Sequence, residues 1–259
     1  MDAVKLARLD QTVMDWLAEM QANVMTRIDQ RMSIETKANE RDLVTNVDRE
    51  TEQFYVKMIR RFDPQAKILG EEGFGDSVKN MDGHVWFVDP IDGTMNFVKQ
   101  HAEFASMLAY FEDGQPVMAW IMDVASSEIV HGGPEYGVFL NDKQITTPPN
   151  LGLADGLLNL SGARLLYEEH GFPELAKAAL GYRVYGSAGI SFLRVLTGRA
   201  VGYASYMKPW DFAAGVVLSS ALGLMTGTID GKPINMLSSS VVLAATNNAY
   251  NDIMAIELR

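Results

Sequence analysis

The chain has 259 residues, 47% hydrophobic and 21% charged, and its 33 Asp and Glu residues outnumber 22 Lys and Arg residues to give a net charge of -11. This composition is typical of a globular protein with a substantial core and excludes a disordered chain. The acidic balance argues against a nucleic-acid partner, but an acidic protein can still bind a small phosphorylated molecule through divalent cations.

Three features of the sequence bear on compartment and membrane association: its Cys content, its first residues and one uncharged segment. The chain has no Cys, so disulfides, thiolate metal sites and thiol nucleophiles are excluded. Its first residues mix charges with apolar side chains and lack the apolar core of a signal peptide, so we expect a cytoplasmic protein. The uncharged segment 212–229 is long enough to span a membrane. Its Ser, Thr and Gly residues, with Gly223 near the middle, instead predict a buried helix followed by a strand, and no membrane partner.

The first half of the chain combines two long helices with short strands. Apolar residues at spacings of three and four from Leu6 to Ile28 predict one amphipathic helix, and 48–61 predicts a second after a looser segment. The Asp113-Gly114 dipeptide indicates a hairpin of antiparallel strands. Strands are predicted at 67–70, 85–88, 104–111, 117–123, 128–131 and 137–140.

The second half alternates helices with strands. A connector rich in Pro and Asn at 146–156 places a sub-domain boundary between 1–148 and 149–259. After this connector, predicted helices alternate with predicted strands, which indicates a sheet covered by helices. The helices are predicted at 172–180, 189–197, 210–222 and 248–258, and the strands at 182–185, 201–206, 225–229 and 241–245.

The densest chemistry follows the predicted strand at 85–88. The segment there is Asp89-Pro90-Ile91-Asp92-Gly93-Thr94. We predict that it forms a turn, which directs two carboxylates and the Ile91 carbonyl toward one point. Hard oxygen ligands of this kind suit Mg²⁺. A helix starting after Gly93 would offer its first N–H groups to a phosphate. Alone, the segment is also compatible with an ordinary Asp-Gly turn.

Two further segments place carboxylates in a similar way. Glu71 and Glu72 follow a predicted strand between two glycines, and adjacent like charges are tolerated when they are solvated or neutralised by a cation. Asp211 opens an apolar helix, where it either caps the helix or adds a third wall to a metal site. The three acidic segments together favour a divalent-metal site that binds phosphate.

These segments resemble, in order and spacing, the signature motifs of the inositol monophosphatase family. The resemblance implies an α/β (α+β) layered α-β-α-β-α sandwich of the inositol monophosphatase and fructose-1,6-bisphosphatase type. It also implies a homodimer that hydrolyses a small phosphate monoester by metal-activated water, with two or three Mg²⁺ per site. The motifs are Asp42-Leu43-Val44-Thr45-Asn46-Val47-Asp48, Gly70-Glu71-Glu72, Asp89-Pro90-Ile91-Asp92-Gly93-Thr94, Gly186-Ser187-Ala188 and Trp210-Asp211-Phe212-Ala213-Ala214-Gly215.

The same resemblance implies a role for each residue. Glu71, Asp89 and the Ile91 carbonyl would hold the first ion. Asp89, Asp92 and Asp211 would hold the second. Asp48 and Thr94 resemble the pair that activates water, with Glu71 also orienting it. The residues implied in substrate binding are Glu71, Ile91, Asp92, Gly93, Thr94, Gly186, Ser187, Ala188 and Asp211.

Three candidate residues keep two interpretations each. Lys37 either lies near the phosphate or is a solvated loop lysine. Glu72 either supports the metal shell or faces water. Lys208 either meets a second phosphate or is an exposed lysine before Pro209.

The preferred substrate is open, because one expected contact is missing. Animal inositol monophosphatases carry a glutamate that binds inositol hydroxyls shortly before the last aspartate, whereas 200–210 contains no Asp or Glu. We rank an inositol 1-phosphate-like substrate first, and fructose 1,6-bisphosphate, NADP 2'-phosphate or 3'-phosphoadenosine phosphates second. A non-catalytic interaction protein is the alternative of another class, and the complete set of acidic ligands speaks against it.

Overall fold

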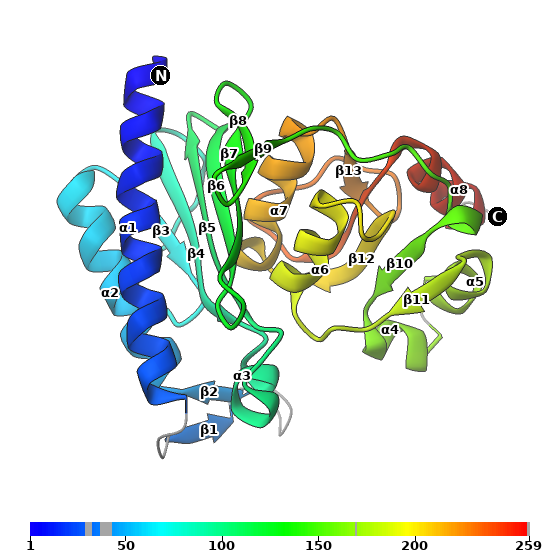
Figure 1. Cartoon of the computed structure of the whole chain (residues 1–259), viewed down its shortest axis with the longest axis horizontal. Coiled ribbons are helices and arrows are strands. Elements are labelled where there is room, and N and C mark those ends of the chain that lie inside the picture. The colour runs from blue at the N-terminus through cyan, green and yellow to red at the C-terminus, as the bar shows by residue number, and fades with distance from the viewer. Residues whose placement is uncertain (29–32, 37–42, 169, 258–259) are drawn as a thin grey trace.

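The computed structural model describes residues 1–28, 33–36, 43–168 and 170–257, which form five layers in the order helices, sheet, helices, sheet, helices (Figure 1). The outer helices α1 (Ala3–Arg27) and α2 (Asn46–Phe62) cover one face of the larger sheet. Helices α6 (Ala188–Leu196) and α7 (Pro209–Ala221) lie between the sheets. This is the predicted α-β-α-β-α order.

The larger sheet has seven strands in chain order, with β3 parallel to β4 and every other neighbour antiparallel. Asp113 and Gly114, both with positive φ, form the predicted turn between β5 and β6. The strands are β3 (Lys67–Gly70), β4 (His84–Asp92), β5 (Ala105–Glu112), β6 (Gln115–Asp123), β7 (Glu128–Gly133), β8 (Gly137–Leu140) and β9 (Lys143–Ile145).

The smaller sheet has the order β11-β10-β12-β14-β13 and mixes parallel with antiparallel pairs. Helices α5 (Phe172–Ala178) and α8 (Asn247–Glu257) pack on its outer face. The strands are β10 (Leu157–Leu160), β11 (Gly181–Arg183), β12 (Gly202–Met207), β13 (Met225–Thr228) and β14 (Ser240–Ala245).

Helix α7 shows why the two halves of the chain share one core. Side chains on nearly its whole circumference are buried, including Phe212, Val217 and Leu218, because a sheet lies on either side of it. Gly215 brings it close to α6, since a Cβ there would lie 2.3 Å from the ring of Phe192. The uncharged segment therefore packs as a buried helix followed by a strand, as predicted. No helix in the described ranges is long and apolar enough to cross a membrane.

The structure corrects several details of the sequence prediction. Strands β9 and β10, the short helix α4 (Gly162–Leu166) and the 3-10 turn Leu153–Asp155 were not predicted. The segment expected to be loose contains β2 (Leu43–Thr45), which pairs with β1 (Ile34–Thr36). The larger sheet ends at Ile145 and the smaller begins at Leu157, on either side of the boundary predicted after residue 148.

Candidate active site

The predicted metal ligands gather around one pocket of about 200 Å³. The pocket opens where β4 ends and α3 (Thr94–Gln100) begins, and α7 closes its opposite side. All five predicted ligands lie in its wall, although they come from positions up to 140 residues apart in the sequence. The lining residues are Leu43, Glu71, Asp89, Ile91, Asp92, Gly93, Thr94, Met95, Gly186 and Asp211.

A β-bulge in β4 aims Asp89 and Asp92 at the same pocket. Asp89 pairs with Met107 and Asp92 with Ala105, so three steps along β4 oppose two steps along β5. Residues three apart in a regular strand point to opposite faces of a sheet. The predicted turn at this segment is therefore wrong: the strand continues through Asp92, and the bulge rather than a turn brings the two carboxylates together.

Asp89 is the most deeply buried carboxylate of the pocket, with 1% of its surface exposed. Among the residues that the structure describes, its Oδ1 has no hydrogen-bond partner. Burial raises the pKa of Asp89 well above its ordinary value, and the charges of Glu71, Asp92, Asp211 and Asp48 raise it further. A buried carboxylate oxygen without a partner, facing other carboxylates, is an environment that a cation would stabilise.

Asp92 is held by the first turn of α6. The Ser187 hydroxyl donates to its Oδ2, and the N–H groups of Ala188 and Gly189 donate to Oδ1 at 3.0 Å and Oδ2 at 2.8 Å. Burial raises the pKa of Asp92 to about 6, although these hydrogen bonds lower it. In the Gly186-Ser187-Ala188 motif, Ser187 and Ala188 therefore donate to Asp92, whereas Gly186 lines the acidic pocket.

Gly93 makes this close approach feasible. Its φ of +83° lies in the left-handed region, and a Cβ there would lie 2.9 Å from the Cβ of Ser187. The next residue starts α3, as predicted, so the first N–H groups of that helix face the pocket region without acceptors inside the helix.

Asp48 and Thr94 contact one another, as the resemblance implied. The Thr94 hydroxyl lies 2.9 Å from Asp48 Oδ1 and 3.1 Å from the Ile91 carbonyl oxygen. Asp48 Oδ2 accepts from both the N–H and the hydroxyl of Thr45, at 2.9 Å and 2.5 Å. These contacts anchor the carboxylate at the first turn of α2. Burial raises its pKa, and the hydrogen bonds from Thr45 and Thr94 oppose that shift.

Asp211 both caps its helix and lines the pocket, so the two interpretations of this residue are compatible. It accepts from the Lys208 N–H at 2.8 Å. Burial raises its pKa to about 8, with the Lys208 hydrogen bond opposing and Asp92 and Glu71 adding to the shift. The Lys208 ammonium lies 5.4 Å from the centre of the Trp210 ring, a cation-π distance.

A second cavity of about 250 Å³ adjoins the acidic pocket and shares Asp92, Gly186 and Asp211 with it. The other polar residues in the described part of its lining carry hydroxyl groups. They belong to Ser161, Ser187, Ser191, Tyr203, Ser205 and Tyr206. The guanidinium of Arg164 lies 5.0 Å from the centre of the Tyr206 ring at its rim.

Three candidate residues had two interpretations each: Lys37, Glu72 and Lys208. Lys37 lies outside the described residues, and neither Glu72 nor Lys208 lines either cavity. Among the residues that the structure describes, no three His, Asp or Glu side chains already converge at metal-ligand spacing.

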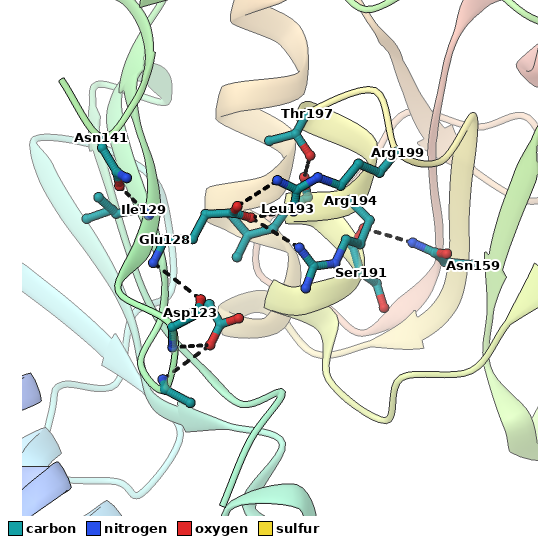
Figure 2. Close-up of polar contacts among 12 residues, drawn as sticks. Asp123, Glu128, Ile129, Asn141, Asn159, Ser191, Leu193, Arg194, Thr197 and Arg199 are labelled. Atoms are coloured by element: carbon teal, nitrogen blue, oxygen red, sulfur yellow. Dashed lines mark hydrogen bonds and ion pairs between the residues drawn. The ribbon is translucent and has the colours of Figure 1, made fainter. Parts of the chain in front are cut away.

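Two supporting contacts had no sequence signal. Asn96 donates to the carbonyls of Glu103 and Tyr185, at 2.8 Å and 2.7 Å, and so ties α3 to the segment that leads into Gly186. Arg194 in the last turn of α6 and Arg199 just after that helix donate to the carboxylate of Glu128 at the start of β7, at 2.8–3.1 Å (Figure 2). A polar residue on an otherwise apolar helix or strand suggests that it has a buried partner, but the sequence does not show which residue that partner is.

Comparison with known proteins gives the class of this molecule. The model of the inositol monophosphatase family matches residues 5–257. The inositol-1-monophosphatase of Bacillus subtilis is 34% identical over 250 residues, which cover 95% of this chain and 94% of the relative. The fructose-1,6-bisphosphatase/inositol-1-monophosphatase of Thermotoga maritima is 29% identical over 213 residues, 82% and 81% of the two chains.

A solved structure agrees with these relatives. The crystal structure of an IMPase/NADP phosphatase complexed with Mg²⁺ and phosphate has a TM-score of 0.89 and 29% identity, and the match covers 97% of this chain and 95% of that one. The chain therefore belongs to the inositol monophosphatase family, whose members are phosphatases that hydrolyse phosphate monoesters. The family and fold implied by the sequence motifs are confirmed.

Proposed function

We propose that this phosphatase is Mg²⁺-dependent and hydrolyses a small monoester of the inositol 1-phosphate type. The observation that carries the proposal is the buried Oδ1 of Asp89, which has no hydrogen-bond partner among the described residues. The other charged residues in the described lining of its pocket are all carboxylates. Such a donor set, with only oxygen atoms, fits a hard divalent cation. The solved neighbour with Mg²⁺ and phosphate supports the choice of metal.

The oxygen donors of the pocket provide ligand sets for two ions. Glu71, Asp89 and the Ile91 carbonyl would hold the first, and Asp89, Asp92 and Asp211 the second. When bound, the ions supply positive charge that acidifies the attacking water and neutralises the phosphate and the leaving oxygen. The N–H groups of Gly93, the N-cap of α3, and of Thr94, its first residue, would hold the phosphate oxygens at the positive end of that short helix.

The chain's own contribution to proton transfer comes from Asp48 and Thr94. A hydroxyl carries one proton, and an ionised carboxylate can only accept, so the Thr94 proton is directed to Asp48 Oδ1. The lone pairs of the Thr94 oxygen are then free to accept a hydrogen bond from the attacking water. As that water is deprotonated, its proton passes to the Thr94 oxygen while the Thr94 proton passes to Asp48 Oδ1. Because Thr45 anchors the other oxygen of Asp48, this pair orients the nucleophile from a rigid support.

The second cavity is the proposed binding place of the alcohol part of the substrate. Its lining of Ser and Tyr hydroxyls can donate to and accept from the hydroxyls of a polyol such as inositol. These groups take the place of the glutamate that is missing from 200–210. A bisphosphate or nucleotide substrate is the second candidate. It is supported by the Arg164 guanidinium beside Tyr206 of the cavity, by the fructose-1,6-bisphosphatase/inositol-1-monophosphatase of Thermotoga maritima and by the solved IMPase/NADP phosphatase.

The proposal is tested by phosphate release from inositol 1-phosphate, fructose 1,6-bisphosphate, NADP and 3'-phosphoadenosine 5'-phosphate, compared as kcat/KM with Mg²⁺ and with EDTA. We expect turnover only with Mg²⁺ and the highest kcat/KM for inositol 1-phosphate. Asp89→Asn should lower kcat/KM at least about a hundredfold, which corresponds to ~2.7 kcal/mol of transition-state stabilisation. Asp63→Asn, a change to a carboxylate that pairs with His84 away from the pocket, is the matched control. Equal turnover in EDTA would contradict the proposal.

We also propose a homodimer, on the basis of the family resemblance. Exposed apolar side chains support it: Leu166 and Tyr167 at the end of α4, and Leu180, Tyr182 and Val184 along the edge strand β11. Light scattering on Tyr182→Lys should show more monomer than wild type. A monomeric wild-type protein at micromolar concentration would contradict the dimer. The cytoplasmic location remains a prediction from the sequence.

A further inference from the structure

The loop that carries Glu71 is wrapped around the carboxylate of Glu52. Glu52 lies on α2, one turn after Asp48, and its surface is 0% exposed. Its Oε2 accepts from the Glu72 N–H at 2.5 Å, and its Oε1 accepts from the Phe74 N–H at 2.8 Å. A buried carboxylate is costly unless hydrogen bonds compensate it, and bonds to a charged acceptor are among the stronger ones. The carboxylate and the loop therefore stabilise one another.

The two glycines of the Gly70-Glu71-Glu72-Gly73 segment adapt the loop to this anion. A Cβ on Gly70 would lie 2.6 Å from both the carboxyl carbon and Oε1 of Glu52, so the carboxylate rests directly against the Gly70 backbone. Gly73 has a φ of +82°, a conformation that bends the chain between the two N–H donors. Successive N–H groups curved around one anion form the arrangement known as a nest.

Glu71 lies between two attachments of this loop. Its own N–H donates to the Val88 carbonyl at 3.3 Å, and Val88 immediately precedes Asp89 on β4. The following N–H groups, from Glu72 and Phe74, are held by Glu52. The Glu71 backbone is thus positioned relative to Asp89 from one side by β4 and from the other side by α2.

We propose that Glu52 is a positioning residue, which holds Glu71 at the cation site without touching the cation or the substrate. This inference rests on the proposed metal-dependent function. The role requires the carboxylate itself, because each of its two oxygens accepts an N–H. A glutamine has one accepting oxygen, and its NH₂ group would face the N–H of Glu72 or Phe74, donor against donor.

The test compares Glu52→Gln with Glu50→Gln, which removes the same charge two residues earlier on α2 but affects an exposed pair with Arg27. Mg²⁺ binding to the protein without substrate is measured by calorimetry, and backbone amide exchange is followed at Glu72 and Phe74. We expect Glu52→Gln to weaken Mg²⁺ binding by about tenfold or more, the usual range for residues that orient a ligand. Both amides should exchange faster, and high Mg²⁺ should restore much of kcat. Glu50→Gln should bind Mg²⁺ as wild type does.

A second variant guards against failure of Glu52→Gln to fold. Gly70→Ala pushes against the same carboxylate from the loop side while Glu52 remains. It should also weaken Mg²⁺ binding, and the double variant should lose less than the sum of the two, because both changes disrupt one contact. Wild-type Mg²⁺ affinity in folded Glu52→Gln would overturn the positioning role alone. Absence of Mg²⁺ binding by the wild-type protein would overturn the proposed function and this inference with it.

Discussion

The hydroxyl of Ser187 donates a hydrogen bond to the carboxylate of Asp92, 95 residues earlier in the chain. Ser187 is also the N-cap of α6 and accepts from the Ile190 N–H at 3.2 Å. The contact joins the last residue of β4 to the central helix layer. The positive end of α6 therefore faces a carboxylate of the pocket, and the pocket is completed only when the two halves of the chain are packed together.

Asp92→Asn separates the structural and chemical roles of this carboxylate. We expect the variant to fold and to lose phosphatase activity, because an amide removes one anionic ligand while keeping the shape. One accepting oxygen is replaced by an NH₂ group facing the α6 N–H groups, so the free energy of unfolding should fall by about 1–3 kcal/mol. Urea unfolding and kcat/KM measure the two effects. Near-normal turnover would contradict the assignment of Asp92 to the metal site.

Thr94→Val tests the orientation of the nucleophile. Valine keeps the shape of threonine but has no hydroxyl. Asp48 therefore loses a hydrogen-bond donor, and the attacking water loses an acceptor. We expect kcat to fall by about 10²–10⁴-fold, the usual contribution of a positioned proton-transfer group. Thr94→Ser, which retains the hydroxyl, is the control and should keep most of the activity. An active valine variant would remove Thr94 from the mechanism.

Glu128→Ala tests the ion pair that joins β7 to the far end of α6 (Figure 2). The Glu128 side chain is 19% exposed, as is that of Arg194, so truncation leaves a half-buried guanidinium without this carboxylate. We expect the free energy of unfolding to fall by about 1–3 kcal/mol. Glu174→Ala, which removes the exposed pair with Lys177, should change it by less than about 1 kcal/mol. Equal effects of the two variants in urea unfolding would refute this difference.

His131 makes stability depend on pH. Its Nδ1 lies 2.8 Å from Asp10 Oδ1, and its Nε2 lies 2.9 Å from the Asn141 carbonyl, an acceptor only. Burial lowers the pKa of His131, but the hydrogen bond and charge of Asp10 outweigh it, and the net shift is upward from 6.5.

Because the folded pKa is raised, the stabilisation is fully present below about pH 6.5 and is lost as the pH rises through the folded value. Unfolding free energy measured between about pH 6 and 9 should therefore decline, and His131→Gln should reduce the slope. The same slope in both proteins would contradict a charged His131.

Much of the fold was readable from local patterns. The spacing from Leu6 to Ile28 predicts α1, and alternation with an Asp-Gly turn predicts the β5–β6 hairpin, because each element buries one face and repeats with its own period. The elements that were missed are short: β9, β10 and α4 have three to five residues, too few to display a period.

The acidic motifs and their order identify the family and predict the metal ligands, because residue type alone sets which donor atoms a segment can offer. How these predicted ligands are held cannot be seen from the motifs, because it depends on the folded chain. Contacts between distant segments produce three features of the site. They are the bulge that turns Asp89 and Asp92 to one side, the hydrogen bonds from α6 to Asp92, and the hydrogen bonds from the Glu71 loop to the carboxylate of Glu52. Local spacing reports the preference of a segment, whereas these contacts arise only when layers pack and buried polar groups must find partners.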